Sequence, residues 1–319
     1  MQRVLVLILV NPGIEIDVGH GSRVLLAVTF SADGEYLLTG GKDLRVWRVK
    51  DGKEMAKLEL EATYVWCLAV SQDGRWITAG GWAGVSVWDA KTFEKVLSNE
   101  DGLTRGVDFS PDSTRLVSAS SNGSKGTASI WDTATRKRVQ KLDHGDQWVW
   151  AAKYSPEGDH DRLATTTEDS VRVWDGNDGH LLKHINLAKV GRSPDALRWF
   201  NNHLLVVSER KFKRFEVSTG SESVSEWPVP CPNYAPYTAL SKHGGFIATE
   251  SEHTVTFWDT ATHTQLGLIQ FKHPQDTSSI ALSPDDRFLA IAGKDGKITI
   301  NSLYRIAVSI LSRCTSAYQ

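Results

Sequence analysis

The stretch VSVWDAKT at residues 85–92 ends a short apolar run in a tryptophan and an aspartate, and related stretches recur along the chain. The tryptophan position is occupied at seven places: Trp47, Trp88, Trp131, Trp174, Phe215, Trp258 and Ile300. Successive positions are 41, 43, 43, 41, 43 and 42 residues apart. Self-similarity at such a period is typical of repeat architectures, whose units pack mainly on their neighbours. The sequence therefore predicts seven structural repeats.

A second motif, a serine-led turn such as SADG or SPDS, runs in phase with the first. It begins at Ser31, Ser71, Ser110, Ser155, Ser241 and Ser283, and the fifth unit has Asn201-Asn202 instead. Each turn separates two apolar runs, which predicts a β-hairpin. With the tryptophan segment and a weaker run after it, each unit reads as four short strands, named a to d.

The segments VSVWDAKT, SIWDTATRK, VRVWDGNDG and FWDTATH resemble the WD-repeat (WD40) β-propeller family, from about residue 14 to residue 301. The resemblance implies an all-β fold over residues 14–302: a seven-bladed propeller with four antiparallel strands per blade. It also implies that the strand-c tryptophans are packing residues. The match is degenerate, because Gly19-His20 keeps the family's Gly-His element and His144-Gly145 reverses it. We therefore expect no blade to carry the family's full His, Ser/Thr, Asp and Trp tetrad.

Closure of the ring requires the two chain ends to meet, because an open propeller exposes a sheet edge. Residues 14–18 precede Gly19-His20, where an outer strand belongs, and we expect them to pair with residues 297–301 of the last repeat. Residues 304–312 are the alternative for that edge. Residues 1–13 are an apolar segment in which residues 4–10 favour an extra buried strand over a secretory signal. Residues 303–319 are predicted as a C-terminal strand or tail.

Composition limits the classes of partner. The formal net charge of −2 gives no general attraction to nucleic acid or anionic lipid, and the apolar run is too short to span a bilayer. The basic run RKFKR at residues 210–214 is interpreted as a solvated hairpin, so nucleic acid is not favoured. Three widely spaced cysteines fit a reducing compartment. The predicted location is the cytoplasm, with the nucleus as the alternative.

Partners of this family bind the narrow face of the propeller, where the d–a and b–c loops emerge. The resemblance implies that two positions of each blade are exposed on this face. They lie four and six residues before the last apolar residue of strand a. The predicted partner-binding residues are Tyr64, Trp66, Arg105, Trp148, Trp150 and Tyr234, with Trp82 from a b–c turn. Trp, Tyr and Arg are enriched at interaction hot spots. The competing interpretation is that some rings pack between blades or line the channel mouth.

The sequence is thus interpreted as a non-catalytic scaffold or adaptor that binds protein or peptide partners, within a larger complex or polypeptide. It contains no GxSxG, HExxH or GxxxxGK[ST] motif, so no catalytic, cofactor-binding or metal residues are predicted. One alternative is a reader of modified peptides, in which Trp66, Trp148 and Trp150 cage a methylated ammonium. Another is an enzyme with its site at the channel mouth, although strand a shows no excess of acids or histidines.

Overall fold

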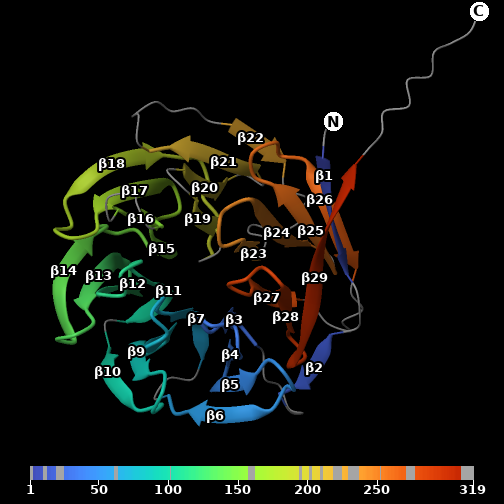
Figure 1. Cartoon of the computed structure of the whole chain (residues 1–319). Helices are drawn as coiled ribbons and strands as arrows, with labels where there is room; N and C mark the ends of the chain where they lie inside the picture. The colour runs from blue at the N-terminus through green and yellow to red at the C-terminus, as the bar shows by residue number, and fades with distance from the viewer. Residues whose placement is uncertain are drawn as a thin grey trace, which may run out of the picture.

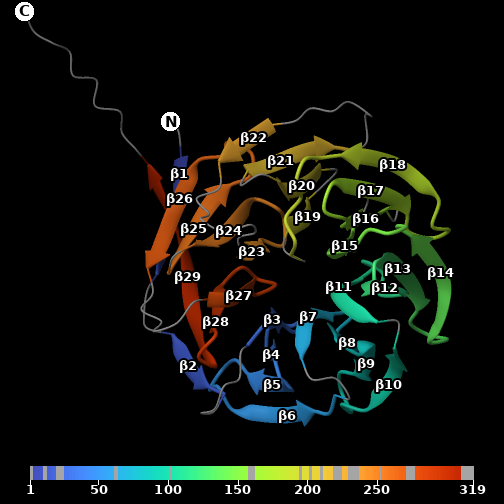
Figure 2. The same cartoon turned by 180° about the vertical axis from the view of Figure 1, so that it is seen from behind.

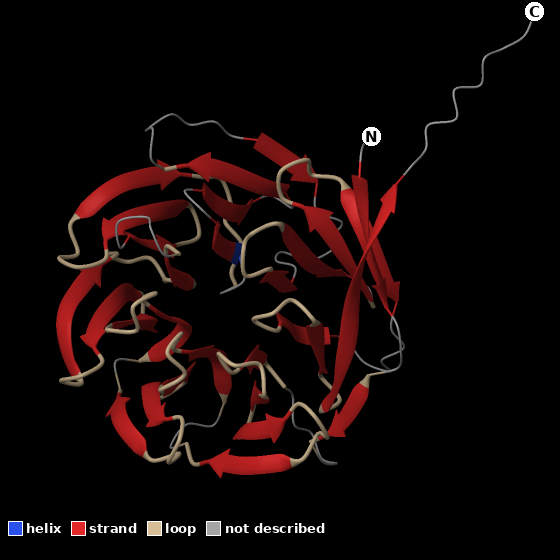
Figure 3. Cartoon of the chain, viewed as in Figure 1, coloured by secondary structure: helices blue, strands red, loops and turns tan. Residues whose placement is uncertain are grey.

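The part of the chain that the structure describes consists of strands and loops apart from a helical turn at Ala196 (Figure 3). The computed structural model describes residues 3–9, 13–18, 25–60, 64–100, 102–156, 162–193, 196–200, 203–208, 211–217, 225–228, 237–251, 253–270 and 277–309. Seven antiparallel sheets stand around a central axis, with β3, β7, β11, β15, β19, β23 and β27 innermost (Figures 1 and 2). The predicted seven-bladed propeller is therefore confirmed.

The first three blades follow one another without crossovers. Blade 1 contains β3 (Ala27–Phe30), β4 (Tyr36–Gly40), β5 (Leu44–Arg48) and β6 (Glu54–Leu58). Blade 2 contains β7 (Val65–Val70), β8 (Trp76–Gly81), β9 (Gly84–Asp89) and β10 (Lys95–Asn99). Blade 3 contains β11 (Leu103–Phe109), β12 (Arg115–Asn122), β13 (Lys125–Asp132) and β14 (Lys137–Asp143).

The next three blades repeat this order. Blade 4 contains β15 (Ala151–Tyr154), β16 (Arg162–Thr166), β17 (Ser170–Asp175) and β18 (Leu181–Asn186). Blade 5 contains β19 (Leu197–Phe200), β20 (His203–Ser208), β21 (Lys211–Glu216) and β22 (Ser225–Pro228). Blade 6 contains β23 (Tyr237–Leu240), β24 (Phe246–Ser251), β25 (Thr254–Asp259) and β26 (Gln265–Gln270).

Blade 7 closes the ring with strands from both ends of the chain. It contains β27 (Thr277–Leu282), β28 (Phe288–Gly293), the long β29 (Lys297–Ser309) and β2 (Ile14–Asp17). β2 pairs with the first part of β29, from Ile14 opposite Ile300 to Asp17 opposite Lys297, as expected. The later residues of β29 do not compete for this edge, because they pair with β1 (Arg3–Leu9) beyond the blade (Figure 1).

Burial follows the position of each strand within its blade. The second strand is covered on both faces, and in β8 every residue is buried. The innermost β7 alternates between buried and half-buried residues, since one of its faces borders the channel. The outermost strands are largely exposed and bury one apolar residue each in blades 3 and 4, Leu142 and Ile185. Apolar burial thus lies between blades and not on the rim.

The strand-c tryptophans are packing residues, as predicted. Trp88 of blade 2 packs with Leu38, Val46 and Leu58 of blade 1, and Trp131 and Trp174 pack in the same way on blades 2 and 3. Four of these indoles also donate a hydrogen bond of 2.9–3.0 Å to a strand-b hydroxyl; the pairs are Trp47–Thr39, Trp131–Ser118, Trp174–Thr165 and Trp258–Thr249. Each ring therefore joins two blades.

One predicted position in this series is wrong by one residue. In blade 1, Trp47 lies opposite Leu37, and in blade 7 the residue opposite the equivalent Leu289 is Asn301. Ile300, which the spacing had placed there, packs with Ile16 and Ile298 in the core shared with blade 1. Successive residues of a strand face opposite sides of the sheet, so a shift of one residue moves the side chain to the other interface.

His144 shows how far the family tetrad is preserved. Its Nδ1 lies 3.1 Å from the carbonyl oxygen of Leu142, and its Nε2 lies 2.8 Å from the hydroxyl of Thr165. Nδ1 donates to that carbonyl, and burial lowers the pKa of the imidazole, so at neutral pH the ring is neutral and Nε2 accepts from the Thr165 hydroxyl, which itself accepts the indole N–H of Trp174. The fourth member is a backbone carbonyl and not a carboxylate. The expected absence of a full tetrad is therefore confirmed for this blade.

Closure of the ring predicts a large effect of shortening Ile16. Its side chain is 3% exposed in the core between blades 7 and 1. Ile16→Ala should lower the free energy of unfolding by about 2–5 kcal/mol, because it leaves a cavity. Chemical denaturation measures this. The control is Glu15→Ala on the exposed side of the same strand, which should have little effect; equal effects would contradict this role of β2.

Burial of His144 predicts a pH dependence of stability. Burial lowers its pKa from 6.5 to about 4. Between those values the unfolded chain binds a proton that the folded chain does not, so stability decreases as pH falls through this window and is unaffected above it. The loss should reach about 3 kcal/mol near pH 4. Urea denaturation at several pH values should show that the free energy of unfolding depends less on pH in His144→Gln than in the wild type. The same pH dependence in both proteins would contradict its assignment to His144.

Candidate partner-binding site at the channel mouth

Five of the predicted residues form one continuous cluster across blades 2 to 4. The guanidinium carbon of Arg105 lies 4.1 Å from the ring centre of Trp66, 4.6 Å from that of Trp150 and 5.7 Å from that of Trp148. Trp82 meets Trp66 edge-on at 5.2 Å, and Trp148 lies 5.5 Å from Trp150. We call Trp66, Trp82, Arg105, Trp148 and Trp150 the Trp–Arg cluster.

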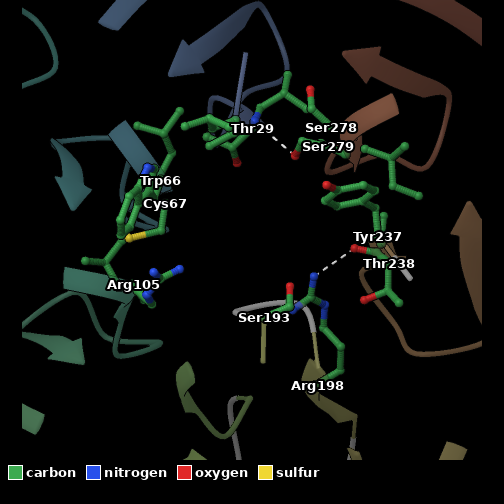
Figure 4. A pocket seen from close by; sticks show the side chains of 18 of the residues that line it. Thr29, Trp66, Cys67, Arg105, Ser193, Arg198, Tyr237, Thr238, Ser278 and Ser279 are labelled. Carbon is green, nitrogen blue, oxygen red and sulfur yellow. Dashed lines mark hydrogen bonds between the residues drawn. The ribbon is translucent and has the colours of Figure 1, made fainter. Parts of the chain in front are cut away.

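Irregular strand pairing directs two of these side chains into the channel. In β7 the register shifts between Val65 and Cys67, which leaves Trp66 without a residue opposite it. In β11 the register shifts between Thr104 and Gly106, which does the same for Arg105. Such bulges re-aim the side chain of the extra residue. Trp66 and Arg105 thereby line the central cavity at the same level of neighbouring blades (Figure 4).

A glycine allows the next blade to approach Arg105. A Cβ atom on Gly106 would lie 3.0 Å from the backbone nitrogen of Ala152 and 3.1 Å from the Cα atom of Ala151, so a larger residue would push β15 away. The adjoining loop is tied to blade 3, since the backbone N–H of Val149 donates to Ser121 and the indole of Trp148 donates to the carbonyl of Gly123. These contacts hold the tryptophans of blade 4 beside Arg105.

The cavity itself is the propeller channel. It has a volume of about 560 Å³ and is lined by residues of all seven innermost strands. Its described lining includes four cations, Arg105, Lys153, Arg192 and Arg198, and no carboxylate. Burial lowers the pKa of Arg105, but a guanidinium remains charged in proteins. The channel mouth is therefore a cationic, aromatic-walled site.

The remaining predictions for the site have different outcomes. Trp82 is 55% exposed and Tyr64 is 36% exposed, but the described ring contacts do not join Tyr64 to the cluster. Trp150 is only 7% exposed, so the prediction that it lies on the surface is wrong; its ring is the buried base on which Arg105 stacks. Tyr234 lies outside the described residues.

The sequence interpretation missed three of the four cations. Lys153 directly precedes Tyr154, the last apolar residue of strand a in blade 4, and Arg198 lies two residues before Phe200, the last residue of β19. Extending the count to the two positions before the end of strand a would have found them. Arg192 lies in the loop before β19 and follows no repeated position.

Other classes of site receive no support from the described part of the chain. Phe212, the aromatic residue of the basic run, is 2% exposed and packs in the core between blades 5 and 6, so it offers no ring to a nucleobase. Among the described residues, no group of three His, Cys, Asp or Glu side chains is placed to hold a metal ion. Nor do these residues include a helix with the length and apolarity that crossing a membrane requires.

The fold and this channel define a WD-type β-propeller, and comparison with known proteins agrees. The family model described as WD domain, G-beta repeat matches residues 14–47, 52–89, 92–132, 136–175 and 268–300. These segments make up more than half of the chain. The chain therefore belongs to the WD-repeat family.

Similar proteins come from several WD-repeat groups. The chain is 22% identical to Eukaryotic translation initiation factor 3 subunit I of Neurospora crassa, over 89% of each chain. It is 25% identical to Nuclear distribution protein nudF of Emericella nidulans, over 53% of this chain and 43% of that protein. It is 32% identical to Small ribosomal subunit protein RACK1y of Oryza sativa subsp. japonica, over 31% of this chain and 29% of that protein. The chain thus spans less than half of the latter two proteins.

The different burial of two cluster members predicts different effects on stability. Trp150→Ala should lower the free energy of unfolding by about 3–5 kcal/mol, because it removes a buried ring. Trp82→Ala should cost at most about 1 kcal/mol, chiefly through its edge contact with Trp66. Thermal and chemical denaturation compare the two variants. A larger loss of unfolding free energy from Trp82→Ala than from Trp150→Ala would contradict the assignment of Trp150 as the buried ring and Trp82 as the exposed one.

Proposed function

We propose that this chain is a non-catalytic adaptor that binds a protein or peptide partner across blades 2 to 4 of its narrow face. The observation that carries the proposal is the Trp–Arg cluster, which runs from exposed Trp82 to the channel lining at Trp66 and Arg105. Exposed aromatic surface joined to a rigid, partly buried base is typical of interaction hot spots.

The comparisons support the broader part of this proposal. WD-repeat relatives include a translation initiation factor subunit and a small ribosomal subunit protein, so a place within a larger complex is proposed for this chain too. The proposed location is the cytoplasm, with the nucleus second. This rests on the three widely spaced cysteines.

Neither alternative is favoured by a specific observation. A reader of methylated ammonium groups needs an empty aromatic cage, but the guanidinium of Arg105 occupies the space between Trp66 and Trp150. An enzyme at the channel mouth needs acid or base groups there, and the described lining is cationic. Retention of a hydrolase or transferase activity through purification, and its loss with a single substitution at the channel, would favour the enzyme.

Affinity capture from a cell lysate tests the adaptor. Wild-type protein is compared with Trp66→Ala/Trp82→Ala, which removes the exposed ring of the cluster and the half-buried ring beside it. The matched control is Val139→Ala/Leu182→Ala, which truncates two exposed apolar side chains on outer strands of blades 3 and 4. We expect specific partners to be captured by the wild type and the control but lost, by about 100-fold in affinity or more, from the cluster variant.

Thermal denaturation first establishes that both double variants fold. If the cluster variant does not, Trp82→Ala alone serves, because its side chain is exposed. Undiminished capture of every partner by a folded cluster variant would overturn the proposed surface.

A further inference from the structure

Arg105 stands out because its charge has no counter-ion. Within the described structure no carboxylate lies within ion-pair distance of it, and it forms no hydrogen bond; its contacts are the three indole rings. The Nε atom is buried, whereas the terminal nitrogens point into the open cavity (Figure 4). A half-buried guanidinium held in this way has its hydrogen-bonding edge available.

The other three cations of the cavity are engaged. Lys153 lies 3.3 Å from a carboxylate oxygen of Asp108, and Arg192 lies 2.8 Å from one of Glu168. Arg198 donates to the carbonyl oxygens of Thr238 and Leu197, at 2.7 and 3.0 Å. Among the four cations of the described lining, Arg105 is therefore the one whose N–H groups have neither an ion-pair partner nor a hydrogen bond.

The cavity can admit a chain segment next to that charge. Its volume of about 560 Å³ is in the range of ligand pockets, and Ser278, Ser279 and Thr29 line it across from Arg105 (Figure 4). The exposed ring of Trp82 lies at the end of the cluster, beside Trp66. A peptide lying on these rings would bring a side chain to the guanidinium.

We propose that Arg105 binds a carboxylate of an acidic peptide that enters the channel mouth. This rests on the proposed function, for which it names the chemistry of the partner. The planar guanidinium offers two parallel N–H groups to the two oxygens of a carboxylate, and its stacking on Trp66 and Trp150 fixes the orientation of that plane before binding. Binding therefore needs no further ordering of the arginine.

The charge count favours an aspartate, glutamate or C-terminal carboxylate over a phosphate. A phosphate group carries close to two negative charges at neutral pH, and a site for it needs more than one cation without a partner. Here, Lys153 and Arg192 already have carboxylate partners of their own. A single carboxylate matches the one cation of the described lining whose N–H groups have no partner.

Fluorescence polarisation tests this with three labelled peptides: hexaglutamate, hexaglutamine and a glycine–serine peptide with one phosphoserine. We expect saturable binding of hexaglutamate to the wild type at low ionic strength, weakened by salt, and weaker or no binding of the other two. Arg105→Gln should weaken hexaglutamate binding by about 10- to 100-fold. Arg105→Lys should lose part of it, because an ammonium keeps the charge without the planar edge.

The matched control is Arg75→Gln. Arg75 also stacks on a tryptophan, 4.6 Å from the ring centre of Trp76, but it is exposed and lies outside the cavity. This variant makes the same change in net charge and should bind hexaglutamate like the wild type. If Arg105→Gln does not fold, Arg105→Lys carries the comparison.

Three results would overturn the proposal: no saturable binding of hexaglutamate to the wild type, equal weakening by Arg75→Gln, or tighter Arg105-dependent binding of the phosphoserine peptide. The proposed function fails separately. If lysate partners are lost from Trp66→Ala/Trp82→Ala but retained by Arg105→Gln, the adaptor surface stands and only the carboxylate assignment falls.

Discussion

The packing of a strand-c aromatic ring against the preceding blade is the interaction on which the rest of this structure depends. Trp88 packs on blade 1, Trp131 on blade 2, Trp174 on blade 3 and Phe215 on blade 4. Blade 4 retains a His–Thr–Trp chain without its acid, so its polar network is incomplete. Apolar burial between blades is therefore the main stabilising contribution to the fold, at about 25 cal/mol per Å² of apolar surface.

The innermost strands contribute to this packing with alternate residues, as Val65, Cys67 and Ala69 of β7 show, so their other residues can carry the site. Trp66 and Arg105 lie at bulges near the start of β7 and β11. A bulge at the end of a strand changes the direction of one side chain without disturbing the ladder that follows. The residues of the channel mouth can therefore differ between propellers that share the same fold.

Most of the fold could be predicted from the sequence because each repeat carries two markers, the tryptophan and the serine-led turn. The turn is informative for a physical reason. In the Ser71 turn the hydroxyl donates to Asp73 and accepts the backbone N–H of Trp76, so the serine and the aspartate are required together. Where a marker is missing, the sequence no longer determines which residue takes the tryptophan position. Blade 7 has no aromatic residue in the position, and the spacing then chose Ile300 instead of Asn301.

The site was harder to predict because neighbouring blades decide it. Counting along strand a selected Trp66 and Arg105, which line the channel, but nothing in that count shows that Trp150 is buried. The bulges are also invisible in the sequence, since one unpaired residue changes which side chains face the channel without changing the motif spacing. The periodicity of the sequence indicates on which face of a strand a residue lies. Which side chains line the channel depends on all seven innermost strands together.

Keeping the charge of Arg105 half-buried costs free energy that its contacts within the chain do not offset. A half-buried charge loses hydration, and stacking on Trp66 and Trp150 returns about 0.5–2 kcal/mol. A leucine there would fill the same space between the rings without burying a charge. Lys153 and Arg192 show that this fold does supply acidic partners to cations near the channel, from Asp108 and Glu168. Arg105 has no such partner among the described residues, and this contrast is what supports the proposed binding of an external carboxylate there.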